Sequence, residues 1–282
     1  MDLTTLVRQG EPVRLAEIDP GFHAGLGKGE VADRLAVLGP RLAELTDLLF
    51  AAGMHSLLVV LQGRDTSGKD GVIRRLLTHI NAQSCRVAPF KQPTPEELAH
   101  DFLWRVHAQT PARGSIVLFN RSHYEDVLVV RVHGMVDAAE CIERYREINA
   151  FERALHRNGA IIQKFMLHIS DEEQEERLLE RESDVTKSWK LTVGDWEERK
   201  LWPKYEKAYQ DALSHCSDDH APWRIVAADH KWFRDLAIVS ALVDELEPYR
   251  AAWMAKLETQ GREQVRLLNE YRANAGATEA AK

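Results

Sequence analysis

In the stretch 57-LLVVLQGRDTSGKDG-71, an unbroken apolar run leads directly into a glycine-containing loop that ends in a lysine. Its spacing matches the phosphate-binding pattern G-x-x-x-x-G-K-[ST] at Gly63, Gly68 and Lys69. A strand, a glycine turn and a helix in this order place backbone N–H groups and the positive end of the helix dipole around one anion. We therefore predict a phosphate site here; a chance glycine turn is the alternative, and the flanking strand and helix argue against it.

The loop carries acids where the common pattern has none. Asp70 stands where a magnesium-binding hydroxyl is expected, and Asp65 lies inside the loop. Mg²⁺ prefers oxygen ligands, so we expect Asp65 to face the metal. Asp70 has two interpretations that stay open: it binds the metal as well, or it interacts favourably with the helix dipole at the first turn.

Strand-like apolar runs recur along the chain, with helical periodicity between them. Alternation of this kind predicts βαβ units and an α/β fold in which a five-stranded parallel sheet carries helices on both faces. The five runs are Leu57–Leu61, Arg86–Phe90, Ile116–Phe119, Ile161–Ile169 and Trp223–Ala227.

The chain is expected to divide into three parts. Residues 1–53 form an N-terminal extension and a helix that packs on the core, and residues 251–282 form a helical tail whose polar end is expected to fray. Residues 54–250 form the core. Its last helix, over Trp232–Leu246, is amphipathic and either covers the sheet or forms an interface; we favour the sheet, because a helix on a sheet needs such a face.

Composition excludes several classes of protein. The net charge of −7 over 282 residues argues against nucleic-acid binding, which usually needs a basic surplus on one face. No window approaches the roughly 18 apolar residues that cross a bilayer, so we expect no membrane partner and a cytoplasmic location. The three cysteines, Cys85, Cys141 and Cys216, are far apart and predict reduced thiols rather than a disulfide framework or a zinc site.

A second motif follows the strand in 115-SIVLFNRSHYEDVLVV-130. The carboxyl ends of parallel strands gather ligands, so this junction should lie beside the glycine loop. Arg121 can grip phosphate oxygens with two hydrogen bonds. Asn120 occupies a place where phosphate-loop enzymes commonly have a magnesium-binding acid, so the carboxylate would come from Glu125 or Asp126. An ordinary ion pair is the alternative role for Arg121 and Asp126.

The segment 181-RESDVTKSWKLTVGDWEERKLW-202 interrupts the alternation of strands and helices. Long insertions in compact domains tend to be functional, and basic groups on such a lid can cover a phosphoryl group and exclude water. A solvated, charged helix is the alternative. The basic residues of the segment are Arg181, Lys187, Lys190, Arg199 and Lys200.

With these pieces in order, residues 57–246 resemble the family-2 polyphosphate kinases. The resemblance rests on the stretches GRDTSGKDG, FKQPTPEELAHDFLWRVH, FNRSHYEDVLVVRVHG, ERESDVTKSWK and APWRIVAADHKWFRDLA, which occur in the family's order. Their wording is most similar to class III, whose members phosphorylate both AMP and ADP. The chain departs from the family's lid motif at Val185, where proline is usual, and at Ser188, where a basic residue is common.

The resemblance implies a three-layer phosphate-loop kinase fold with a helical lid, like thymidylate and nucleotide kinases, and a homo-oligomer, dimer or tetramer. It implies transfer of the terminal phosphoryl group of inorganic polyphosphate to AMP or ADP, which yields ADP and ATP, with Mg²⁺ or substituting Mn²⁺ held by Asp65 and Asp126. The implied catalytic residues are Asp65, Lys69, Arg121 and Arg181. The residues expected along the polyphosphate groove are Gly63, Gly68, Lys69, Arg74, Arg75, Arg121 and Arg131, and those expected at the nucleotide and lid are Lys91, Glu125, Lys187 and Lys190.

Two other functions remain open from the sequence. A nucleoside or nucleotide monophosphate kinase that uses ATP would share the sheet, the loop and the lid, and differ in its phosphoryl donor. A non-catalytic nucleotide-binding module would result if Asp70, in place of the usual hydroxyl, had disabled metal binding.

Overall fold

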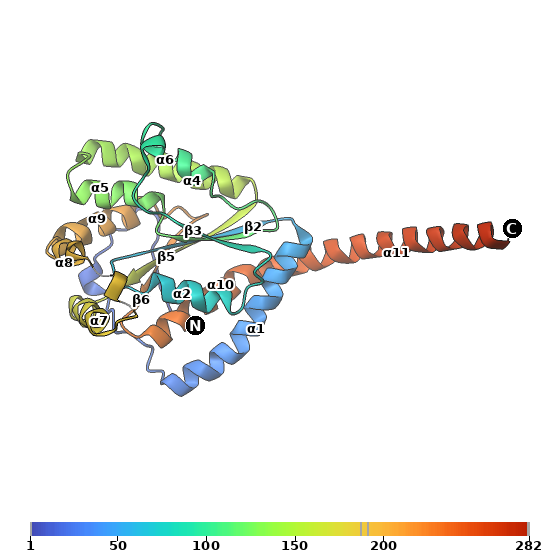
Figure 1. Cartoon of the computed structure of the whole chain (residues 1–282), viewed down its shortest axis with the longest axis horizontal. Helices are drawn as coiled ribbons and strands as arrows, with labels where there is room; N and C mark the ends of the chain where they lie inside the picture. The colour runs from blue at the N-terminus through green and yellow to red at the C-terminus, as the bar shows by residue number, and fades with distance from the viewer. Residues whose placement is uncertain (1, 187, 191, 281–282) are drawn as a thin grey trace.

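The computed structural model describes residues 2–186, 188–190 and 192–280, apart from the side chains of Lys190 and residues 274–280. Within these residues, one six-stranded sheet has the order β1-β6-β5-β2-β4-β3 (Figure 1). All neighbouring pairs are parallel except β1 with β6. The strands are β1 (Thr5–Leu6), β2 (Ser56–Gly63), β3 (Cys85–Pro89), β4 (Ile116–Asn120), β5 (Ala160–His168) and β6 (Trp223–Ala227).

The five predicted strands are confirmed as β2 to β6, and the prediction of a wholly parallel, five-stranded sheet is wrong at one edge. There β1 adds a sixth, antiparallel strand through Thr5 and Leu6. Its pairing is extended by the N–H of Val7, which donates to the carbonyl of Trp223 at 2.9 Å. A two-residue strand leaves no periodicity to read, because alternation needs about four residues to be recognised.

Helices cover both faces of the sheet, as the alternation along β2 requires. Leu57, Val59 and Leu61 belong to one core with α1, α2 and α10, whereas Leu58 and Val60 belong to a second core with α6 and α9. The α-helices are α1 (Lys28–Ala52), α2 (Lys69–Leu77), α3 (Pro95–Leu98), α4 (Trp104–His107), α5 (Val129–Val132), α6 (Ala138–Arg157), α7 (Asp171–Ser183), α8 (Val193–Arg199), α9 (Trp202–His215), α10 (Lys231–Leu246) and α11 (Arg250–Ala280). Short 3-10 helices are η1 (Leu15–Glu17), η2 (His123–Val127), η3 (Ser188–Lys190) and η4 (Glu247–Tyr249).

The last core helix, α10, covers the sheet. Leu236, Val239 and Leu242 are fully buried in the core that it shares with α1 and α2. This confirms the interpretation of Trp232–Leu246 as a core helix. The three cysteines form no disulfide in the described part of the chain, as predicted, and Cys141 and Cys216 are buried.

The strand order creates a switch point above β2. From β2 the chain proceeds to β3 and β4 on one side, and later to β5 and β6 on the other. The carboxyl ends of β2, β4 and β5, at Gly63, Asn120 and His168, therefore lie next to one another. Ligands of open α/β sheets bind in the crevice at such a point.

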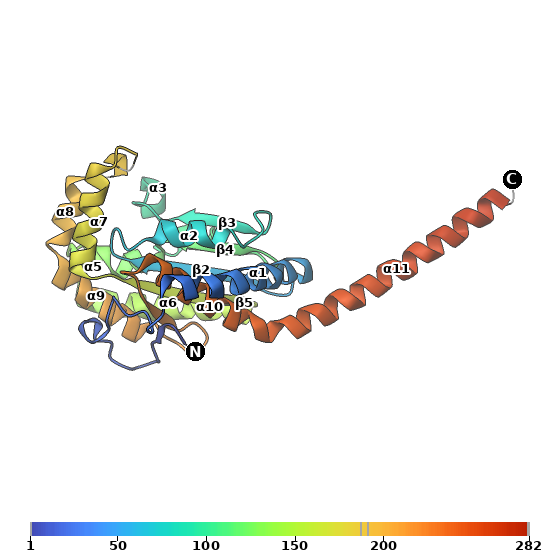
Figure 2. The ribbon, with the colours of Figure 1, turned by 90° about the horizontal axis from the view of Figure 1, so that it is seen from below.

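The final helix, α11, projects far from the body, at the end opposite α7 and α8 (Figures 1 and 2). Its first turns are anchored: Trp253 is buried and donates from Nε1 to Nδ1 of His55 at 3.0 Å, and Lys256 Nζ donates to the carbonyl of Ala52 at 2.6 Å. The helix continues to Ala280, into the polar end of the chain. Among the described helices, none combines the length and the apolar character that crossing a bilayer requires.

Candidate active site

The phosphate loop joins β2 to α2 and runs from Gly63 to Lys69. Its backbone needs glycine at Gly68, where φ is +100° and an added Cβ would lie 1.9 Å from Nη1 of Arg234. Lys69 folds back over the loop and donates from Nζ to the carbonyls of Gly63 at 2.6 Å and Arg64 at 3.0 Å. Burial lowers the pKa of Lys69 to about 8. The ammonium group is thus held at the loop, where it can interact with a phosphate.

Arg121 is the first residue after β4 and reaches toward the same loop. Its φ of +62° is rare for a residue with a side chain, and its backbone N–H donates to the carbonyl of Leu61 at 3.1 Å. Its guanidinium binds Asp65 at 2.6 Å and Glu125 at 3.3 Å. Burial opposes the charge, yet the Glu125 and Asp65 carboxylates hold the pKa of Arg121 above its usual value. Arg121 therefore stays cationic between two acids.

A cavity of about 340 Å³, which we call the phosphate cleft, opens over the loop. Predicted residues from four separate segments meet there: the loop, the end of β3, the end of β4 and the lid. The cleft is lined by Asp65, Thr66, Gly68, Lys69, Asp70, Pro89, Phe90, Lys91, Asn120, Arg121, Arg181 and Asp195. The structure thus brings together the loop lysine, Lys91, Arg121 and Arg181.

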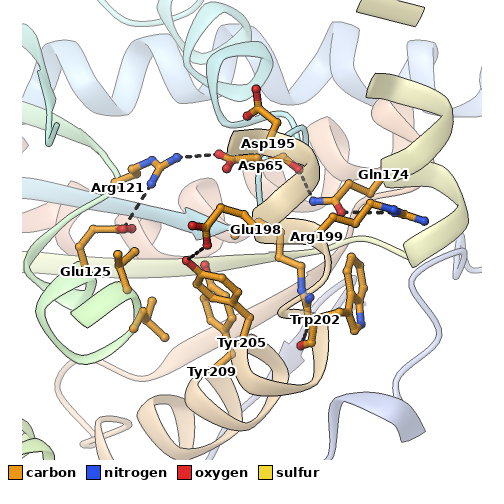
Figure 3. A pocket seen from close by; sticks show the side chains of 14 residues that line it. Asp65, Arg121, Glu125, Gln174, Asp195, Glu198, Arg199, Trp202, Tyr205 and Tyr209 are labelled. Atoms are coloured by element: carbon orange, nitrogen blue, oxygen red, sulfur yellow. Dashed lines mark hydrogen bonds and ion pairs between the residues drawn. The ribbon is translucent and has the colours of Figure 1, made fainter. Parts of the chain in front are cut away.

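Figure 3 shows a second, smaller cavity of about 40 Å³, which we call the aromatic pocket. Asp65, Arg121 and Asp195 line both this pocket and the cleft. The aromatic pocket is lined by Gly63, Arg64, Asp65, Arg121, Glu125, Leu128, Val129, Gln174, Asp195, Glu198, Arg199, Trp202, Tyr205 and Tyr209. The aromatic pocket has the rings of Trp202, Tyr205 and Tyr209, whereas the cleft has Lys69, Lys91 and Arg181, which do not line the pocket.

Three arginines predicted along the groove do not reach either cavity. Arg131, on α5, binds Asp211 at 2.6 Å and the Tyr145 hydroxyl at 3.1 Å. Arg74 and Arg75 are exposed on α2, and Arg75 contacts Asp235 at 3.4 Å. Helical spacing is the cause: residues five and six positions after Lys69 point away from the loop that Lys69 covers.

Asp126, predicted to bind metal with Asp65, also lies outside both cavities. It is 13% exposed and faces Arg144, whose Nη1 is 3.9 Å from Oδ1 of Asp126. Burial raises the pKa of Asp126 to about 6, and its Oδ2 is buried with no hydrogen-bond partner in the described part of the chain. The turn of η2 directs Glu125 to Arg121 and Asp126 to the opposite side. Of the two acids that the sequence left open, Glu125 is the one at the site.

The residues of the cleft fit a divalent metal that arrives with phosphate. The described residues contain no group of three or more His, Cys, Asp or Glu side chains arranged to hold a metal. Asp65 and Asp70 nevertheless both line the cleft, and Asn120 donates to Asp70 Oδ1 at 2.9 Å. Mg²⁺ is commonly held by one or two carboxylates, with phosphate oxygens and water completing its shell.

Of the basic lid residues whose side chains the structure describes, one lines the cleft. Arg181, near the end of α7, lines the cleft. Lys187 lies outside the described residues, as does the side chain of Lys190. Arg199 points elsewhere: it binds Asp171 at 2.9 Å and Glu175 at 2.6 Å, and so joins α8 to α7.

Three residues that the sequence did not indicate contact the backbone of the loop. Gln174 Nε2 donates to the carbonyl of Asp65 at 3.0 Å, and Arg177 Nη1 donates to that of Thr66 at 2.9 Å. Arg234 Nη1 lies 3.5 Å from the carbonyl of Ser67. One feature of the sequence could have indicated Gln174 and Arg177: their spacing places them on the same face of α7 as Arg181.

Comparison with known proteins identifies the family. The family model described as polyphosphate kinase 2 matches residues 26–252. An AMP/ADP-polyphosphate phosphotransferase from Meiothermus ruber is 48% identical over 221 residues, 78% of this chain and 83% of that protein. An ADP-polyphosphate phosphotransferase from Rhodopseudomonas palustris is 39% identical over 263 residues, 88% of this chain and 90% of that protein. The crystal structure of polyphosphate kinase 2 from Arthrobacter aurescens TC1 is similar with a TM-score of 0.83 and 42% identity, covering 86% of this chain and 88% of that one.

Proposed function

The chain belongs to the polyphosphate kinase 2 family, and on that premise we propose that it transfers the terminal phosphoryl group of inorganic polyphosphate to AMP or ADP. The products are ADP and ATP, respectively. Relatives named for transfer to AMP, to ADP and to both support an adenine nucleotide as the acceptor.

One observation carries the proposal: Lys69, Arg121 and Arg181 line the same cleft. Polyphosphate is a chain of anhydrides with no base or ribose, so its site needs repeated cations along one path rather than a nucleoside pocket. Lys91 extends the basic lining at the end of β3. A row of cations beside a phosphate loop fits such a polymer.

The reaction is an in-line displacement in which the terminal phosphate oxygen of the acceptor attacks the end phosphorus of the polymer. The anhydride bond from that phosphorus to the next phosphate breaks, and polyphosphate shorter by one phosphate leaves. That oxygen is already ionised, so no strong general base is needed, and catalysis depends on alignment and charge neutralisation. The loop N–H groups and Lys69 bind the donor phosphates. Arg121, which lines both cavities, interacts with the phosphoryl group in transfer, while Asp65 and Glu125 fix its orientation.

Asp65 and Asp70 are the residues that would hold Mg²⁺, or Mn²⁺ in its place. When bound, such an ion neutralises negative charge on the phosphates and helps to orient them. Asp126 is not part of this set, because its side chain faces Arg144 and not the cleft.

The test is a donor assay. The purified protein is incubated with Mg²⁺, polyphosphate and AMP or ADP, with no nucleoside triphosphate added, and ADP and ATP are followed separately. We expect ADP or ATP to form with polyphosphate as the only phosphoryl donor, and no product when the metal is removed by chelation. Phosphorylation of AMP by ATP but not by polyphosphate would overturn the proposal and favour a nucleotide monophosphate kinase.

A further inference from the structure

The carbonyl oxygens of the phosphate loop are all engaged from Gly63 to Ser67. Lys69 Nζ takes the first two, at 2.6 and 3.0 Å. The next three face side chains from distant parts of the sequence: Gln174 and Arg177 on α7, and Arg234 on α10. The carbonyls of Asp65, Thr66 and Ser67 are therefore held by side chains from outside the loop.

These three side chains are buried, with residue exposures of 5% for Gln174, 4% for Arg177 and 3% for Arg234. Removing a guanidinium from water is costly unless its donors are satisfied. Arg177 meets that condition by donating from Nη2 to the carbonyls of Ala228 at 2.7 Å and Asp229 at 2.8 Å, and from Nε to Glu173 at 2.7 Å. It thus joins α7, the end of β6 and the loop through one planar group.

Arg234 is fixed in a similar way. Its Nη2 binds Asp235 at 2.6 Å, and its Nη1 occupies the space where a side chain of Gly68 would be. The contact of 3.5 Å with the carbonyl of Ser67 is the weakest of the three. Arg234 therefore supports the loop mainly by packing and charge, whereas Gln174 and Arg177 make short hydrogen bonds.

The direction of these bonds has a consequence for anion binding. The C=O and N–H of a trans peptide group point to opposite sides. When the carbonyls of Asp65 and Ser67 are held outward, the N–H groups of Thr66 and Gly68 are directed to the other side. Thr66 has a φ of +65°, a conformation that persists only when its surroundings enforce it. The hydrogen bond from Arg177 to its carbonyl supplies such a constraint.

We propose that Gln174, Arg177 and Arg234 are positioning residues that hold the phosphate loop in its anion-binding conformation before the anion arrives. The inference rests on the proposed function only for the identity of the anion. Gln174, Arg177 and Arg181 lie on one face of α7, so the same helix sets the position of Arg181 relative to the loop.

The experiment compares Gln174→Met and Arg177→Lys with Glu176→Ala, a control on the exposed side of the same helix. Methionine keeps the size of glutamine without its donor, and lysine keeps the charge of arginine without its planar set of donors. Three quantities are measured: hydrogen exchange of the amides in residues 63–70, the affinity for tripolyphosphate by calorimetry, and turnover with polyphosphate.

We expect faster exchange in the loop, about tenfold weaker binding of tripolyphosphate, and a loss of kcat/KM on the order of 10²-fold, the scale that follows from small misplacements of reacting groups. Glu176→Ala should match the wild type in all three. A generally destabilised protein would exchange faster throughout the sheet, so the inference requires the change to be confined to the loop. If Arg177→Lys unfolds, Gln174→Met decides, because it removes no charge; besides the hydrogen bond to the loop it removes a weak contact of 3.4 Å between Oε1 and Nη1 of Arg199.

The outcomes separate this inference from the proposed function. Loop exchange and tripolyphosphate affinity that stay at wild-type values in both variants would overturn the inference, even if the wild type uses polyphosphate. A clear response of exchange and affinity, in a protein whose wild type does not turn over polyphosphate, would sustain the positioning role and overturn the proposed function.

Discussion

The phosphate loop and the lid both line the phosphate cleft, and both are rich in charge, but the protein holds them in different ways. Lys69 is 8% exposed, and the carbonyls on either side of Thr66 are held by side chains of the core. In the lid, by contrast, Val185 is 87% exposed and Trp189 and Val193 are each 77% exposed. The loop is the fixed part of the site, whereas the lid has exposed apolar side chains that it could still bury.

This difference indicates that the loop and the lid contribute to phosphate binding in different ways. A loop whose donors are already aimed loses little freedom when a phosphate binds, which favours alignment of the reacting groups. A lid with exposed apolar side chains can bury them when it closes, and closure excludes water from the transfer. Substitutions in the loop should therefore affect rate more than substitutions in the lid.

The largest effect is expected at the fixed part of the site. Lys69→Ala and Arg121→Ala should each lower kcat on the order of 10²- to 10³-fold, as the loss of one electrostatic stabiliser does in other enzymes. Circular dichroism and thermal unfolding should show that both variants stay folded. Arg146→Ala, which removes an arginine that is 70% exposed on α6, is the matched control and should leave kcat unchanged.

A near-native kcat in Lys69→Ala or Arg121→Ala would remove that residue from the catalytic set. It would also weaken the contrast between loop and lid, since the fixed residues would then have no larger role than the exposed ones.

A smaller loss is expected from the lid. Arg181→Ala should lower kcat/KM about tenfold, equivalent to about 1.4 kcal/mol, because Arg181 lines the cleft but contacts neither the loop backbone nor Arg121 among the described interactions. Steady-state rates at varied polyphosphate concentration would measure it. A loss of activity as large as that of Lys69→Ala would show that Arg181 contributes as much to catalysis as the residues of the loop.

The same contrast explains what the sequence could predict. The loop and the strands are contiguous patterns, so Gly63, Gly68 and Lys69 and the five parallel strands could be read directly. Arg121 followed from the rule that carboxyl ends of neighbouring strands meet. The assignment of Asp126 failed because two adjacent residues of η2 face opposite sides, which depends on tertiary packing.

Contacts of distant side chains with the backbone of the loop could not be predicted. Gln174 and Arg177 recognise backbone carbonyls, which every residue has, so no partner residue type marks the contact in the sequence. Arg131 was misplaced for a related reason: its partner Asp211 lies 80 residues away on α9. β1 was too short to show alternation and is held by pairing with β6, which follows it by more than 200 residues.

The dependence of activity on pH tests the role of Lys69 in another way. Because burial lowers the pKa of Lys69 to about 8, its ammonium form should predominate at pH 7 and decline above pH 8. The charged form binds phosphate, so kcat/KM, which reports the free enzyme, should fall about fourfold between pH 7 and 8.5. Lys69→Arg, which does not titrate in this range, should lose that decline. A decline that persists in Lys69→Arg would assign it to another group.

The smallest effect is expected on stability in the lid. Trp189 is 77% exposed, so its side chain buries little surface. Trp189→Ala should therefore change the free energy of unfolding by less than about 0.5 kcal/mol. In the sheet, Trp223→Ala should cost about 3–5 kcal/mol, because Trp223 is 2% exposed and its ring packs edge-on against Tyr124. Urea unfolding without ligand would measure both. A cost above about 1 kcal/mol for Trp189→Ala would mean that the lid packs against the rest of the protein even without substrate. The lid would then be held in place before substrate binds, as the loop is.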